Sequence, residues 1–101
     1  HHTFQREGNN LRRVLNVDFT DAALGGRVNV KGIDHKSYQL NLPAGTDSGK
    51  IFRLKNKGMP VYGKTGEFGD LLITINVIVP KNLNPKQLKL IEELRDSLNN
   101  N

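Results

Sequence analysis

Three histidines and a few paired carboxylates are the side chains of this 101-residue sequence that could perform catalysis or hold a metal. Asp34 precedes His35, and such a pair can orient a general base, but the sequence places no nucleophile beside it. The two histidines that open the chain could bind a metal weakly, yet no third ligand accompanies them. Glu92 and Glu93 are consecutive on a predicted helix, so their side chains do not converge. We therefore expect no enzyme, no metal site and no cofactor, and interpret His35 as a surface residue of a turn.

The glycines do not form a phosphate-binding loop. Gly25 and Gly26 precede a predicted strand, not a helix N-terminus whose backbone amides could cradle a phosphate. The glycines further along the chain also lack the spacing of a P-loop (Gly58, Gly63, Gly66 and Gly69). We interpret all of them as turn residues, because glycine accepts backbone conformations that other residues resist.

The composition indicates one small domain with a modest core. The chain has 101 residues, of which 36% are hydrophobic. It contains no cysteine, which excludes disulfides and thiolate metal sites, and no apolar run approaches the roughly 18 residues that a membrane span needs. We therefore expect a cytoplasmic location. The abrupt ends, two histidines and three asparagines, suggest a fragment of a longer protein.

The net charge of +5 leaves two interpretations open. A basic chain can attract nucleic acid or another acidic partner. The same charge lies in the range that simply keeps a small domain soluble. Residues 50–64 are the most basic stretch, but Phe52 and Leu54 alternate there with lysine and arginine, as on a strand with one solvated face. Tyr62 near Lys64 is one candidate for stacking on a nucleic-acid base.

The elements that must position any site are mostly strands. Apolar residues recur at every second position from Leu71 to Val79, which predicts a long half-buried strand that ends at Pro80. The same alternation predicts further strands over residues 11–19, 27–33, 38–42 and 50–55. Short strands with frequent turn signals favour a mainly β fold, a small two-layer β-sandwich.

Two connections between these strands have a character of their own. Residues 20–26 favour a helix of one or two turns, with Thr20 or Asp21 as its cap and Gly25 as a left-handed stop. Residues 56–69 form a long glycine-containing loop. Because the loop exceeds the usual length of a connection, we expect it to be either mobile or functional.

A C-terminal amphipathic helix is predicted after the last strand. Asn84 can cap it, Pro85 suits its first position, and residues 86–98 have helical periodicity. One face carries a row of apolar side chains: Leu90, Ile91, Leu94 and Leu98. This row could pack on the domain's own sheets or on its copy in a second chain, and the sequence leaves both open.

Several segments, in order along nearly the whole chain, resemble the C-terminal region of DnaJ-family co-chaperones. Residues 1–11 (HHTFQREGNNL) are similar to the family's HP-x-F-x-R-x-G-x-[DN]-L pattern, with His2 in place of proline. AALGG at 22–26, and PAGTDSG at 43–49 followed by KGMP at 57–60, match further elements. The pattern GDL…P…L…Q is matched by Gly69, Asp70, Leu71, Pro80, Leu83 and Gln87. The order and spacing of these motifs make the resemblance specific.

The resemblance implies a substrate-binding β-sandwich over residues 1–80 and a dimerisation helix over residues 81–101. It implies a co-chaperone fragment that binds unfolded protein clients, forms a homodimer and serves a DnaK-type chaperone. The family addresses that chaperone through a J-domain, which has no counterpart in this sequence. A curved-DNA-binding branch of the family and a purely structural dimer base are the alternatives.

The resemblance also implies site residues. The family's best-described client groove lies in the preceding C-terminal domain, and its counterpart here would involve Leu15, Val28 and Val30. These three could equally be core. Arg13 and Gly32 stand where the groove's further apolar positions would be. The dimer contacts would come from the apolar face of the terminal helix: Leu90, Ile91, Leu94 and Leu98.

Overall fold

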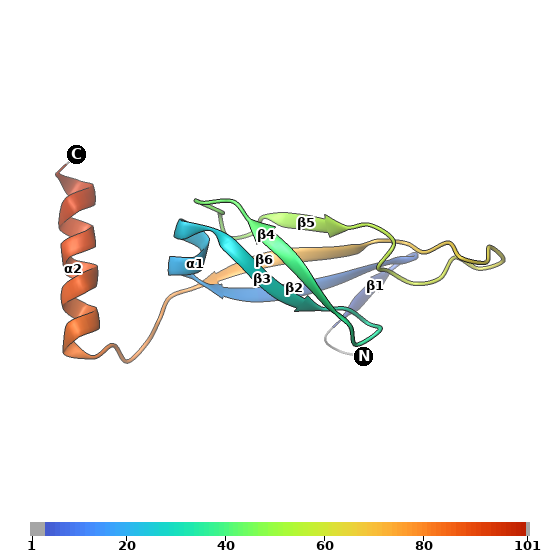
Figure 1. Cartoon of the computed structure of the whole chain (residues 1–101), viewed down its shortest axis with the longest axis horizontal. Helices are drawn as coiled ribbons and strands as arrows, with labels where there is room; N and C mark the ends of the chain where they lie inside the picture. The colour runs from blue at the N-terminus through green and yellow to red at the C-terminus, as the bar shows by residue number, and fades with distance from the viewer. Residues whose placement is uncertain (1–3, 101) are drawn as a thin grey trace.

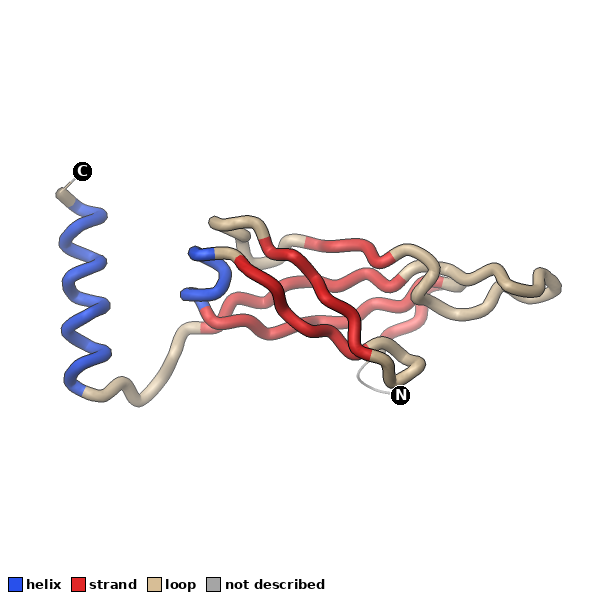
Figure 2. The backbone as a smooth tube through the Cα atoms, in the orientation of Figure 1, coloured by secondary structure: helices blue, strands red, loops and turns tan. Residues whose placement is uncertain are grey.

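Four strands form the larger of two sheets in this computed structural model, which describes residues 4–100 (Figure 1). Their spatial order is β1 (Gln5–Glu7), β2 (Asn10–Asp18), β6 (Leu71–Ile78) and β5 (Ile51–Leu54). The second layer is an antiparallel hairpin, β3 (Gly26–Lys31) and β4 (Ser37–Leu42), which crosses the larger sheet (Figure 2). The predicted small two-layer β-sandwich is confirmed.

Strand β6 is the centre of the larger sheet. It pairs in parallel with β2, from Leu11 opposite Leu71 to Asp18 opposite Ile78, and antiparallel with β5. Its alternating apolar positions Leu71, Ile73 and Ile75 are fully buried between the two layers. Leu72, on the opposite face, is also buried, and its partners in register are Arg12 and Arg53. The stems of such long side chains can cover an apolar neighbour while their charges stay in water.

The core lies between the hairpin and the larger sheet. Each layer supplies residues at every second strand position, as a two-layer packing of pleated sheets requires. The hairpin supplies Val30, Leu40 and Leu42, and the larger sheet supplies Leu11, Val17, Leu71, Ile73 and Ile75. Ala22 of the short helix completes this buried cluster.

The short helix α1 (Phe19–Leu24) begins one residue earlier than predicted. Asp18 occupies the N-cap position without a side-chain capping bond, so the predicted cap by Thr20 or Asp21 is wrong. The reason is that β2 runs directly into the helix: Asp18 keeps an extended backbone as the last residue of the strand. Burial of Ala22 then holds the helix against the sandwich.

Gly25 ends α1, as predicted, with a positive φ of 78°. Its ψ of 176° lies outside the left-handed helical region, so the stop belongs to the glycine-specific extended region instead. A Cβ at this position would lie 2.7 Å from the backbone nitrogen of Ala44 and 2.8 Å from the carbonyl oxygen of Leu42. Conformation and close backbone approach therefore both require glycine.

Residues 56–69 form an arm that projects beyond the sheet (Figure 2). Pro60 and Phe68 pair across it as an antiparallel bridge. The amide of Gly58 donates to the carbonyl of Gly69 at 2.8 Å, and the amide of Met59 donates to the carbonyl of Asn9 at 2.9 Å. The first bond closes the base of the arm, and the second joins the arm to the turn between β1 and β2.

Helix α2 (Pro85–Asn99) stands apart from the sandwich at the other end of the molecule (Figure 1). The predicted start is confirmed: Asn84 Oδ1 accepts from the amide of Gln87 at 2.8 Å, and Gln87 Oε1 accepts from the amide of Asn84 at 2.9 Å. The molecule is consequently elongated, 59 × 27 × 19 Å, with a radius of gyration of 17.4 Å. A compact chain of this length would have about 13 Å. Neither helix described between residues 4 and 100 is long and apolar enough to cross a membrane.

Candidate functional site

The apolar face of α2 is open to solvent. Leu90, Leu94 and Leu98 expose 54%, 47% and 62% of their surface, and no residue of the helix is fully buried. Ile91 is half-buried. The sequence left two arrangements open for this face. The structure excludes one of them, because the face does not pack on the domain's own sheets. We call the row Leu90, Ile91, Leu94 and Leu98 the helix stripe.

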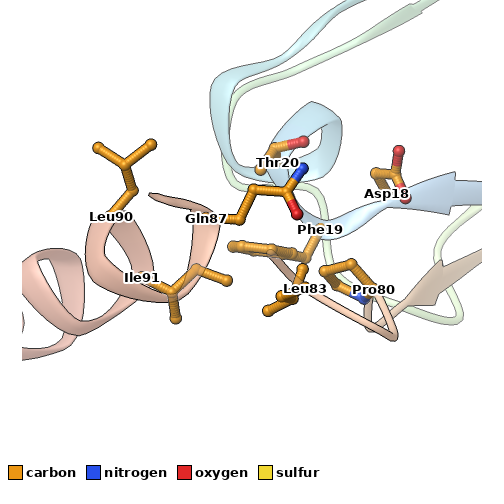
Figure 3. A pocket seen from close by; sticks show the side chains of 8 residues that line it. All are labelled: Asp18, Phe19, Thr20, Pro80, Leu83, Gln87, Leu90 and Ile91. Carbon is orange, nitrogen blue, oxygen red and sulfur yellow. The ribbon is translucent and has the colours of Figure 1, made fainter. Parts of the chain in front are cut away.

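An apolar pocket of about 260 Å³ lies at the foot of the helix stripe (Figure 3). Phe19 reaches into it from the start of α1, toward Leu83 of the connecting segment (Figure 3). Pro80 and Ile91 supply further apolar walls, and the polar members of the lining are Asp18, Thr20 and Gln87. The pocket is therefore continuous with the helix stripe, because Leu90 and Ile91 belong to both.

Sequence reasoning did not assign this pocket. Its signal was present, because Pro80, Leu83 and Gln87 are the spaced residues of the GDL…P…L…Q pattern. Gln87 has a structural use of its own in the capping box of α2. Phe19 lies outside that pattern and was expected only as part of a strand.

The three residues predicted to bind clients lie on the inner faces of the sandwich. Val30 is fully buried in the core. Leu15 and Val28 are half-buried and pack against the same core cluster. These positions leave Val30 no exposed surface, whereas Leu15 and Val28 each retain some.

Arg13 and Gly32, the two departures from an apolar groove, have local structural uses. The guanidinium of Arg13 donates to the carbonyl of Lys31 and lies 5.5 Å from the ring centroid of Phe4. This places a cation beside the end of β3. A Cβ at Gly32 would lie 2.8 Å from the ring of Tyr38. Glycine there allows that aromatic ring to close over the turn.

The pair Asp34 and His35 forms no oriented base. Asp34 Oδ2 accepts from the hydroxyl of Tyr38 and Oδ1 accepts from the amide of Lys36 at 3.0 Å, while His35 is exposed with a φ of 66°. The bond from Tyr38 lowers the pKa of Asp34, and the same bond raises the pKa of Tyr38. Within residues 4–100, no three histidine, cysteine or acidic side chains gather as a metal site would require. His1 and His2 lie outside the described residues.

The class of protein that this fold defines is a small β-sandwich domain with an exposed apolar helix. Residues 1–80 match the family described as DnaJ C terminal domain. The chain is 45% identical over 93 residues to a "Chaperone protein DnaJ" of Leptospira biflexa serovar Patoc, which covers 92% of this chain and 24% of that relative. It is 42% identical over 97 residues to a "Chaperone protein DnaJ" of Zymomonas mobilis subsp. mobilis, which covers 96% of this chain and 26% of that relative.

The chain belongs to the DnaJ family and is a DnaJ-type chaperone domain. The family resemblance predicted from its motifs is thereby confirmed. The chain spans about a quarter of the length of the curated relatives that it matches.

Proposed function

We propose that this domain joins two protomers of a DnaJ-type co-chaperone through α2 and offers apolar surface to unfolded polypeptides. The observation that carries the proposal is the helix stripe, whose three leucines each remain about half exposed or more. Full burial of a leucine contributes about 1.5–3 kcal/mol, so covering three half-exposed leucines on each of two helices is a substantial driving force. The membership of the chain in the DnaJ family supports a chaperone role for it.

A second copy of the chain is the occupant that fits the helix stripe. A two-fold arrangement would present the same stripe and the same pocket on both protomers, which is the isologous contact of most homodimers. The pocket of about 260 Å³ beside Ile91 offers room for an apolar side chain of the partner. The helix is held clear of its own sandwich, so a second helix can approach its stripe directly (Figure 1).

The mass of the protein in solution tests the dimer. Sedimentation across a concentration series should show a dimer that dissociates on dilution. Leu94→Asp should give a monomer, because the interface would bury a charge without a partner. Leu88→Asp is the matched control: Leu88 is 50% exposed on the same helix, but it lies about 120° around from Leu94. A wild-type monomer at every concentration, or equal loss in both variants, would overturn the proposal.

We propose further that clients contact the partly exposed edges of Leu15 and Val28, with Val30 reached only when the β3–β4 hairpin shifts. The support is their position on the inner faces of the sandwich, between the two layers. Val28→Thr keeps the shape of the side chain but adds a hydroxyl, and should weaken binding of a labelled, permanently unfolded polypeptide. Val14→Thr, on the opposite face of β2, should leave binding unchanged. Equal binding by both variants would remove Leu15, Val28 and Val30 as the client site.

Pairing would make weak client sites effective. Two sites in one dimer hold a single unfolded chain with an avidity that can exceed either affinity by about 10²–10⁴. Wild-type protein should therefore bind a long unfolded client far more tightly than Leu94→Asp, while both bind a single short peptide equally. We propose that delivery to a DnaK-type chaperone uses parts of the longer relatives beyond the quarter matched here. The alternative of a purely structural dimer base predicts that neither protein binds clients.

A further inference from the structure

A second cavity lies at the end of the sandwich away from α2, and nothing in the proposed function uses it. It has a volume of about 380 Å³ and opens between the β3–β4 turn and the base of the arm. Two segments that are well separated in sequence form its walls: Ile33, Asp34, Lys36 and Tyr38 on one side, and Lys57, Pro60 and Phe68 on the other. We call it the turn–arm groove.

The turn–arm groove has an apolar lining that faces solvent. Ile33 and Phe68 are both exposed large hydrophobic residues, and Pro60 lies beside Phe68 through the bridge that closes the arm. An apolar wall of this kind favours an aliphatic or aromatic side chain of a ligand. The base of the arm is hydrogen-bonded to the sandwich, so the wall is held in place without a ligand.

The carboxylate of Asp34, a polar group of the groove, already has hydrogen-bond partners within its own turn. The hydroxyl of Tyr38 and the amide of Lys36 occupy the two oxygens of Asp34. Gly32 makes this closure feasible, because a Cβ there would lie 2.9 Å from Asp34 Oδ1 and 2.8 Å from the Tyr38 ring. Asp34 therefore acts as a fixed part of the turn, and its carboxylate is not left free to neutralise a lysine.

Two lysines, Lys36 and Lys57, line the same groove beside Asp34, and neither ammonium group forms an ion pair within the described residues. The ion pairs among residues 4–100 join Glu7 to Arg12, Arg53 to Asp70 and Arg95 to Asp96, and involve neither lysine of the groove. Lys57 Nζ instead lies 4.8 Å from the centroid of the Tyr38 ring, a cation–π contact. The ammonium group of Lys36 attracts Asp34 electrostatically without forming an ion pair with it. Lys55 and Lys64, near the groove residues in sequence, add to the positive charge of this stretch.

We propose that the turn–arm groove docks a short acidic peptide segment of a partner protein. An apolar side chain of the segment would rest on Ile33 and Phe68, and its carboxylates would meet Lys36 and Lys57. Charge complementarity selects this occupant, because the lining joins two unpaired ammonium groups to an apolar wall. A nucleic acid fits less well, because its backbone needs a row of cations along an extended track, whereas two lysines line this groove.

Fluorescence anisotropy with two labelled peptides tests the proposal on the whole chain. The probes are EEFEEL and its uncharged counterpart QQFQQL. We expect the acidic peptide to bind, with an affinity that falls as salt is raised, and the uncharged peptide to bind at least tenfold more weakly. Lys57→Glu and Lys36→Glu should each weaken binding of EEFEEL roughly tenfold or more, since a facing ammonium becomes a repelling carboxylate.

The matched control is Lys89→Glu, which makes the same change of charge on α2 at the opposite end of the molecule. It should bind EEFEEL as the wild type does, and the far-ultraviolet circular dichroism of all variants should agree. Equal weakening in Lys89→Glu and Lys57→Glu would show attraction to net charge alone and overturn the proposal. So would equal affinity for the two peptides, or tighter binding of a 20-nucleotide single-stranded DNA that Lys57→Glu abolishes. None of these outcomes bears on the dimer, which is measured separately by sedimentation.

Discussion

The hydroxyl of Tyr38 donates a hydrogen bond to Asp34 Oδ2, which ties the first part of β4 to the β3–β4 turn. The ammonium nitrogen Nζ of Lys57 lies 4.8 Å from the centroid of the same Tyr38 ring. A residue of the hairpin, one of the turn and one of the arm are thus linked through a single aromatic ring. The linkage fixes the shape of the turn–arm groove and also makes it sensitive to pH.

The bond from Tyr38 lowers the pKa of Asp34 in the folded protein. A carboxyl whose folded pKa is depressed stabilises the fold above its unfolded value of about 3.9, and this contribution is lost as pH falls through the folded pKa. Urea unfolding of wild type and Tyr38→Phe should therefore differ at pH 7 and converge in acid. If the free energies of unfolding of the two proteins differed by the same amount at every pH, the bond would carry no pH-dependent stability.

The same bond raises the pKa of Tyr38. A phenol whose folded pKa is raised stabilises the fold below its unfolded value of about 10, and this contribution is lost as pH rises through the folded pKa. A spectrophotometric titration of the tyrosines should show one titrating above the ordinary value. Asp34→Asn should return the pKa of the shifted tyrosine toward its ordinary value of about 10.

Gly25→Ala should destabilise the domain far more than Gly63→Ala. Both glycines have a positive φ, 78° and 77°, which disfavours alanine at each, and Gly25 in addition has the ψ of 176° that is almost confined to glycine. A methyl group at Gly25 would meet backbone atoms within 3 Å, whereas no heavy atom lies within 4 Å of the same position at Gly63. Chemical unfolding should show an additional loss of at least about 1 kcal/mol for Gly25→Ala. Equal losses of unfolding free energy in the two variants would mean that the backbone around Ala44 shifts to admit the methyl group at no energetic cost.

Ile73→Ala should cost about 2–5 kcal/mol of unfolding free energy, because it empties a fully buried position at the centre of β6. Val79→Ala is the control on the same chain segment. Val79 follows the end of β6 and is largely exposed, so its truncation should change stability by no more than about 0.5 kcal/mol. The comparison also checks where the strand ends, since periodicity alone placed Val79 among the inward-facing residues.

Asn84→Ala should loosen α2 and leave the sandwich intact. The substitution removes the capping bond to the Gln87 amide, at a cost of about 0.5–2 kcal/mol to the helix. The helix makes little contact with the sheets, so this loss stays local. Amide exchange should quicken over residues 85–99, while the urea midpoint of the sandwich remains unchanged. Asn100→Ala, at the other end of the helix, is the control, because Asn100 contributes its backbone amide and not its side chain.

Local chemistry made much of this domain predictable. The alternation from Leu71 onward predicted β6, and Asn84 followed by Pro85 predicted the start of α2 to the residue. Gly25 was correctly placed as the end of α1. These features depend on neighbours within a few positions, since strand pleat, helix capping and glycine conformation are properties of short segments. The predicted cap of α1 was wrong because the strand that precedes the helix, and not a residue within it, sets its first turn.

The strand pattern, the amphipathic face of α2 and the family motifs could all be recognised in the order of the residues. Three features emerged from the folded chain alone: β2 and β6 pair in parallel, α2 stands clear of the sheets, and the turn and the arm close around a groove. Each of these depends on how segments that are far apart in the chain lie relative to one another. Such contacts follow from how whole elements pack, and neither periodicity nor local propensity encodes which faces will meet.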